Sequence, residues 1–429
     1  MRIWVIVPLM FVICINALSA ADFVFNGNTS VYGQGNVDNN DYLSSAEHNQ
    51  TDLYAVQNLS LGFVPDKSFR AQCDASLYGS VCQYTQDMQS YSPSFTLDIN
   101  QMYVQFPVNS STTIFAGKKV VNIGLSSNFP LVNRMNTRYE DPIRGVITEG
   151  TGVVGETLTP VSWASFTGMA FINSNDTIAN YKDINILLYT NFSWKIFTLS
   201  IYSYFEHPFS VAIDWSNLAS SNSSSVTYPA AFSGSVQLGL FTLYTELLTN
   251  TTENKYVVTG NSGNYSSDLS TGIVAEYKAY SLGARYVSTE VTAELEYEYN
   301  PDFYSADESD SLCSYFPSLS SETTKATVAS IVHPMDGQFY QNNAAFSISY
   351  NPTCISDYTF RVNNLISFPS YGCSTDYIGD KLTCGISYKK DQSFLVSVSS
   401  SVGFGGIKSE FVLFDQNCLS VTALVTVFY

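Results

Sequence analysis

The sequence has few charged residues and no long apolar run beyond its N-terminal segment. Only 13% of its 429 residues are charged, whereas globular domains carry about 25%. After Ala21 there is no stretch of 18 consecutive apolar residues, which excludes an ordinary membrane-spanning helix from the rest of the chain. If the mature chain enters a membrane, it does so as β-strands.

The sequence also lacks the patterns of most metal and catalytic sites. His48, His207 and His333 are isolated and no CxxC pair occurs, so we expect neither a metal nor a cofactor. No Gly-x-Ser-x-Gly motif is present. A Ser/His dyad of the outer-membrane lipase type at His207 is the weak alternative to a protein that is not an enzyme. The net charge of −18 argues against a nucleic-acid partner.

The first 21 residues have the features of a secretory signal peptide. Arg2 supplies the positive start, 3–15 the apolar run, and 17–21 the small-residue exit. We therefore predict a signal peptide at 1–21 and an exported chain at 22–429.

Apolar and polar residues alternate with period two along the exported chain. Segments of this kind, such as 53–64, 95–108, 184–192 and 196–204, are broken by turn residues. This pattern is typical of transmembrane strands. We predict an all-β fold, a single transmembrane antiparallel β-barrel of roughly 16 to 18 strands with long extracellular loops.

The final residues carry the clearest strand pattern. Val425, Val427 and Tyr429 share one face of an alternating apolar segment that ends on an aromatic residue. The segment resembles the closing strand of outer-membrane β-barrels of diderm bacteria, which their assembly machinery reads. The resemblance implies an outer-membrane location, with membrane lipid and that machinery as partners. A C-terminal strand of a soluble sandwich is the alternative.

Five long polar inserts interrupt the strand pattern, at 34–51, 126–160, 219–229, 250–270 and 302–338. We expect loops there. The segment 126–160 is the candidate for an inward or plug loop, and 302–338 is expected to be a long polar loop.

Seven cysteines remain after the signal peptide. Cys73 with Cys82, and Cys373 with Cys384, are each spaced to clip a hairpin or its loop, and an exported protein can form disulfides. The connectivity stays open.

Positive charge is concentrated in one stretch, which holds Lys118, Lys119, Arg134, Arg138 and Arg144. Adjacent lysines in a strand point to opposite faces, so one of the two must face the lumen. A basic strip opposite Glu140 and Asp141 would create a transverse field at a constriction. Alternatively, these charges pair with one another and pin a loop inside the barrel.

The same stretch carries a family resemblance. Phe115-Ala-Gly-Lys-Lys-Val-Val-Asn-Ile-Gly124, with Phe129-Pro130 and Asn133 after it, resembles a strand and turn of porin-like and alginate-export-like barrels. Leu295-Glu-Tyr-Glu-Tyr-Asn300 is similar to another strand of those families. Ile123 stands where those families usually have tryptophan. The resemblance implies a porin-like channel.

We therefore interpret the chain as an outer-membrane channel for passive diffusion of small hydrophilic solutes or ions. One alternative is a surface-exposed barrel with a closed lumen that acts as an adhesin, binding or structural protein. The other is a secreted β-sandwich. The solute and the oligomeric state stay open.

Overall fold

The computed structural model describes residues 22–37, 49–66, 69–85, 89–90, 94–133, 135, 137–141, 145–172, 181–212, 228–260, 268–315, 319, 328, 339–370, 372–391, 393–406, 408–409 and 419–428. Among these residues, no helix is long and apolar enough to cross a membrane.

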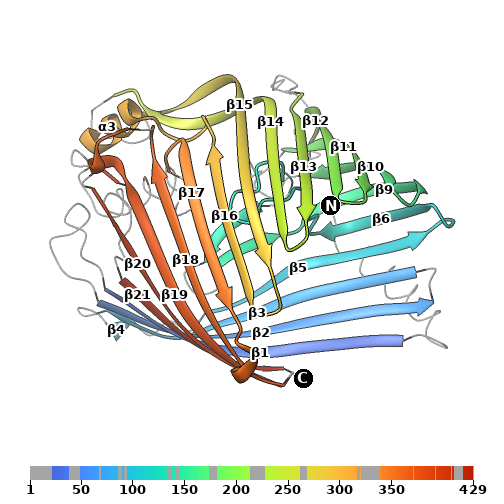
Figure 1. Ribbon diagram of the computed structural model, residues 1–429, viewed down its shortest axis with the longest axis horizontal. Coiled ribbons are helices and arrows are strands. Elements are labelled where there is room, and N and C mark those ends of the chain that lie inside the picture. The colour runs from blue at the N-terminus through green and yellow to red at the C-terminus, as the bar shows by residue number, and fades with distance from the viewer. Residues whose placement is uncertain are drawn as a thin grey trace.

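The described strands form one antiparallel sheet that closes on itself (Figure 1). The sheet has nineteen strands, of which β4 (Gln89–Ser90) has only two residues, so eighteen long strands build the wall. They pair in chain order, and β21 pairs with β1. Closure pairs the first wall strand with the last, so the barrel wall has no free edge strand. The predicted β-barrel and its strand number are confirmed, and the sandwich alternative is wrong.

The wall consists of β1 (Asp22–Val37), β2 (Asn49–Asp66), β3 (Phe69–Thr85), β5 (Ser94–Pro107), β6 (Thr112–Lys119), β9 (Thr151–Val161), β10 (Ala164–Ile172), β11 (Tyr181–Trp194), β12 (Phe197–Ala212), β13 (Ala230–Leu238), β14 (Phe241–Val258), β15 (Leu269–Val287), β16 (Val291–Tyr299), β17 (Asn342–Tyr350), β18 (Tyr358–Phe368), β19 (Gly379–Lys390), β20 (Phe394–Gly405) and β21 (Leu419–Phe428). The other described elements are not part of the wall. They are the hairpin of β7 (Thr137–Asp141) and β8 (Gly145–Glu149), the helix α3 (Ala306–Tyr315), and the short helices η2 (Thr353–Ile355) and η3 (Thr375–Tyr377).

Apolar side chains cover the outside of the wall. On β21, Val425 and Val427 are 41% and 47% exposed, whereas Thr426 between them is buried. Thr426 shares a 2.9 Å hydrogen bond with Ser30 of β1 inside the barrel. The terminal strand thus has the predicted alternation and closes the barrel, while Tyr429 lies outside the described residues.

Some predicted loops are partly strand. The last part of 126–160 is β9, which starts at Thr151. The preceding wall strand, β6, ends at Lys119, so the connection between these two strands spans 120–150. Much of 250–270 is strand, because β14 runs to Val258 and β15 starts at Leu269. The segment 302–338 contains α3. Polar composition alone could not distinguish loops from the polar ends of long strands.

The predicted cysteine pairs do not form. Cys73 and Cys82 both lie on β3, nine positions apart, which is roughly 30 Å at 3.3 Å per residue. A disulfide requires Cα atoms within about 7 Å. Cys373 and Cys384 are free thiols, and Cys384 lies in the middle of β19. The spacing indicated a hairpin at 73–82, but the chain there is one long strand.

The two faces of one strand allow a matched test of the outer wall. Val398 of β20 is 44% exposed on the outside, and Ser399 is its inward neighbour. We expect Val398→Lys to destabilise the barrel by about 2–4 kcal/mol, because it places a charge against lipid. Ser399→Lys, which adds the same charge inside, should have a clearly smaller effect. Urea unfolding in lipid vesicles measures both, and equal losses would contradict the assignment of faces.

Candidate functional site

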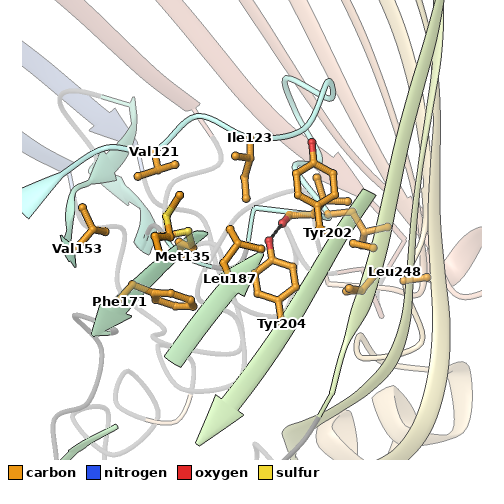
Figure 2. Close-up of a cluster of buried hydrophobic side chains, with 14 of the residues drawn as sticks. Val121, Ile123, Met135, Val153, Phe171, Leu187, Tyr202, Tyr204 and Leu248 are labelled. Atoms are coloured by element: carbon orange, nitrogen blue, oxygen red, sulfur yellow. Dashed lines mark hydrogen bonds between the residues drawn. The ribbon is translucent and has the colours of Figure 1, made fainter. Parts of the chain in front are cut away.

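A segment between β6 and β9 folds into the barrel and forms the main feature of its interior. We call residues 120–133 with Met135 the inward segment. Its side chains Val121, Ile123, Val132 and Met135 are all buried. They pack against inward-facing apolar residues of the wall (Figure 2), namely Phe115, Val153, Met169, Phe171, Leu187, Tyr202, Tyr204, Ala231, Leu248 and Ala279.

This apolar contact involves only part of the wall. The wall residues in contact with the inward segment come from β6 and from β9 to β15. Each fully buried apolar side chain stabilises such a contact by roughly 1.5–3 kcal/mol. The inward segment is therefore held against one half of the wall, and the other half is left to line the remaining lumen.

Glu246 of β14 binds the backbone of the inward segment at two places. Its Oε1 accepts hydrogen bonds from the amides of Leu125 and, at 3.0 Å, of Ser126. Its Oε2 accepts from the amide of Val132 at 3.2 Å. The Glu246 side chain is fully buried, so these amides provide the hydrogen bonds that a buried carboxylate requires.

Glu296 of β16 binds the residues that follow. Its Oε1 accepts from the amide of Ser127 at 2.8 Å, and its Oε2 from the amide of Asn128 at 2.7 Å. The Ser126 hydroxyl also donates to Oε1, at 3.0 Å. Glu296 is 1% exposed. Hydrogen bonds to charged groups are worth about 1.5–3 kcal/mol each, so the two carboxylates hold the segment as firmly as its apolar side chains do.

The strand register brings these carboxylates together. Glu294, Glu296 and Glu298 alternate along β16 and all face inward. Across β15, Glu246 of β14 lies in the same row as Glu298. We call Glu246, Glu294, Glu296 and Glu298 the glutamate row.

A tyrosine crosses β15 to reach this row. The hydroxyl of Tyr244 donates to Glu294 Oε1 at 2.6 Å and also contacts Glu296. Gly283 lies between Tyr244 and Glu296 in the register. A Cβ atom at Gly283 would lie 2.1 Å from the Tyr244 ring, so only glycine allows the tyrosine to lie across the strand.

Arg285 is the cation of this site. Its Nε donates to Glu294 Oε1 at 2.8 Å, and its Nη2 contacts Ser127 Oγ at 2.5 Å. The Arg285 side chain is 34% exposed. The guanidinium therefore lies at the boundary between the buried glutamate row and the remaining lumen.

The segment that resembles porin-like families contains a Gly-Lys-x5-Gly motif, which runs from Gly117 to Gly124. Both of these glycines have positive φ angles, 130° at Gly117 and 89° at Gly124. A Cβ atom at Gly117 would lie 2.3 Å from the carbonyl oxygen of Met102, and one at Gly124 would lie 2.5 Å from Glu246 Oε1. Gly117 thus allows β6 to approach β5, and Gly124 allows the inward segment to approach its carboxylate.

The other half of the wall is polar. A ladder of short hydrogen bonds crosses the inward faces of β1, β2, β3 and β5. Asn58 Nδ2 donates to Asn28 Oδ1 at 2.9 Å, Ser76 Oγ donates to Asn58 Oδ1 at 2.7 Å, and Asn100 Nδ2 donates to Ser76 Oγ at 2.8 Å. We call the inward faces of β1, β2, β3, β5 and β17 to β21 the polar wall.

Two positively charged residues of the predicted constriction, Lys118 and Lys119, have described side chains. Lys119 lies inside the barrel, with Nζ 4.9 Å from the ring centroid of Tyr103 and 4.6 Å from that of Phe115. Lys118 is in register with Met102 on the opposite, outward face. The predicted split of the two lysines is therefore present.

The side chains of the remaining members of that prediction are not described. Arg138, Glu140 and Asp141 belong to β7, which pairs with β8 and not with the wall, and their side chains lie outside the described residues. Arg134 and Arg144 also lie outside the described residues. A transverse field from this set stays a prediction.

Sequence reasoning missed the glutamate row. Alternating glutamates at 294, 296 and 298 in a strand whose other face is Leu295, Tyr297 and Tyr299 place three carboxylates inside a barrel. That spacing was visible in the sequence. The backbone amides that bind Glu296, which are 168 and 169 residues away along the chain, were not.

A second apolar cluster lies at the end of the barrel where α3 is found (Figure 1). It holds Tyr304, Leu312, Tyr315, Leu319, Val328, Phe339 and Tyr340. Lys408 Nζ lies 2.7 Å from Asp310 Oδ1 and 3.0 Å from the Tyr377 hydroxyl. The contact with Asp310 raises the pKa of Lys408 above its usual range. We call this cluster with its ion pair the cap, because it ties three loops together.

The fold is similar to that of solved outer-membrane protein structures. No protein-family model matches the sequence, and no curated protein matches it either. Among solved structures, Pseudomonas aeruginosa OccK8 (OprE) is similar with a TM-score of 0.52 and 11% identity, over 95% of this chain and 98% of that chain. OccK5 (OpdH) of the same organism gives 0.50 and 9%, over 94% and 97%. OpdK with vanillate gives 0.50 and 8%, over 94% and 98%. The barrel fold is shared along nearly the whole chain.

Removing one glutamate should loosen the inward segment. We expect Glu296→Ala to speed amide hydrogen exchange at Ser127 and Asn128, because both amides lose their acceptor. Glu298→Ala is the matched control, since Glu298 lies on the same face of β16 and accepts from Asn343, at 3.2 Å. Equal exchange rates in the two variants would contradict the role of Glu296.

Gly283 offers a second test. We expect Gly283→Ala to lower the free energy of unfolding by about 1–3 kcal/mol, because the added methyl group displaces Tyr244. Gly152→Ala is the control, since a Cβ atom there meets nothing within 4 Å. Unfolding in detergent or lipid gives both values, and an unaffected Gly283→Ala protein would mean that Tyr244 is not held in this position.

Proposed function

We propose that this protein is a channel of the outer membrane of a diderm bacterium, through which small hydrophilic solutes diffuse passively. The observation that supports the proposal is the difference between the two parts of the barrel interior. The inward segment packs against β6 and β9 to β15, and the inward faces of the polar wall carry hydroxyl and amide groups. A closed barrel with an apolar outside and a polar inside is the architecture of outer-membrane channels.

The fixed inward segment would limit solute size. Its backbone is tied to Glu246 and Glu296, so it narrows the lumen without swinging freely. The side chains of the polar wall, such as Ser347, Thr383, Ser399 and Thr422, are half-buried and can replace part of the water around a solute. Binding by such neutral groups is weak, which lets solutes leave as readily as they enter.

The buried carboxylates contribute little to charge selection in this proposal. Glu246 and Glu296 are satisfied by amides, and Glu294 is paired with Arg285. Selection in the open half would therefore depend on size and on the few charges exposed along the polar wall.

One observation favours a second candidate, a surface barrel with a closed lumen that binds partners. The cap ties loops at one end of the barrel into a packed unit, as a binding surface requires. In a channel, the same cap would restrict entry from outside.

Single-channel recording in a planar bilayer separates the two candidates. We expect stable conductance steps from the refolded protein, and a higher conductance from Glu296→Ala because its inward segment is less restrained. A protein that inserts, as judged by heat-modifiable migration, and carries no current would favour the closed surface barrel.

A further inference from the structure

We propose that Arg70 of the polar wall and Lys119 of β6 form a binding subsite for small oxyanions inside the barrel. The inference names a solute class for the channel and therefore rests on the proposed function. Arg70 comes from β3 and Lys119 from the end of β6, and β5 lies between these two strands.

Each cation contacts a glutamine of this part of the wall. Arg70 lies in register with Gln105 of β5, and its Nη2 donates to Gln72 Oε1 at 2.9 Å. Lys119 Nζ donates to Gln105 Oε1 at 3.4 Å. Because Gln105 is opposite Arg70 in the register and accepts from Lys119, the two cations lie near the same part of the inner wall.

An aromatic surface supports the patch from behind. Lys119 Nζ lies over the rings of Tyr103 and Phe115, and the Tyr103 hydroxyl donates to Gln72 Oε1 at 3.0 Å. An aromatic ring carries no net charge, so these cation–π contacts hold the ammonium group without neutralising it.

Within the described part of the chain, neither Arg70 nor Lys119 forms an ion pair. The carboxylate of Asp74 lies further along the same face of β3, where it accepts from Ser60 at 2.5 Å, Gln72 at 2.7 Å and Gln101 at 3.0 Å. Asp74 is therefore satisfied by neutral groups, and two positive charges are left together in a chain of net charge −18.

The chemistry of the pair points to oxyanions. Arginine offers a planar fork of donors that matches two oxygens of a carboxylate or phosphate, and lysine adds a point charge. Arg70 is exposed and Lys119 is half-buried, so water competes and binding is weak. A weak site raises the local concentration of anions without trapping them.

The subsite lies close to one mouth of the barrel. Arg70 is the second residue of β3, directly after the short connection from β2. A solute would meet Arg70 at the end of the barrel where β2 is joined to β3.

The first experiment measures ion selectivity. We would record reversal potentials of the wild-type channel and of the double variant Arg70→Gln, Lys119→Gln in gradients of potassium acetate and potassium phosphate. We expect the anion-to-cation permeability ratio to fall about twofold or more when both charges are removed. Lys195→Gln is the control, because Lys195 lies in the turn between β11 and β12, against Trp194. An unchanged ratio in the double variant would overturn the subsite.

The second experiment does not depend on conduction. Folded protein in detergent micelles should broaden the phosphorus resonance of inorganic phosphate, and the double variant should broaden it less than Lys195→Gln does. Equal broadening in all three proteins overturns the subsite even if the barrel conducts. Selective broadening in a barrel that carries no current would keep the subsite and reject the channel.

Discussion

Two buried carboxylates bound to backbone amides organise the interior of this barrel. Glu246 and Glu296 accept hydrogen bonds from a stretch of chain that has no regular secondary structure of its own. Inside a wall of strands, the amides of such a stretch would otherwise lack partners, and the carboxylates would be buried charges without compensation. Each group meets the requirement of the other, so the inward segment has one preferred position.

The apolar half of the interior follows from that position. In that position, the side chains of Val132 and Met135 pack against the wall. The hydroxyl of Ser127 contacts Arg285 instead. A wall that faces a packed segment can bury apolar side chains, whereas a wall that faces water need not. The apolar residues that contact the inward segment therefore lie on β6 and on β9 to β15, beside polar groups such as Glu246 that bind its amides.

The same logic explains the glycines. Gly117, Gly124 and Gly283 each lie where another group occupies the space of a side chain. They allow a close approach of β6 to β5, of the inward segment to Glu246, and of Tyr244 to the glutamate row. Part of the resemblance to porin-like families therefore has a physical basis in this chain, because both glycines of the motif have backbone angles that other residues rarely adopt.

The sequence by itself determined the wall. Alternation with period two fixes which residues face out, and the uncharged apolar face of the last strand requires lipid on that side; Val425 and Val427 were placed correctly for this reason. Only the tertiary structure decided the interior. The amide partners of Glu246 and Glu296 are 114 to 121 and 168 to 169 residues away along the chain, and Lys119 lies two strands away from Arg70 around the wall. Local patterns carry no information about such contacts, because they depend on the register of strands and on the path of a loop through a closed space. The cysteine pairs failed for the same reason, since spacing along the chain does not reveal whether the chain turns back.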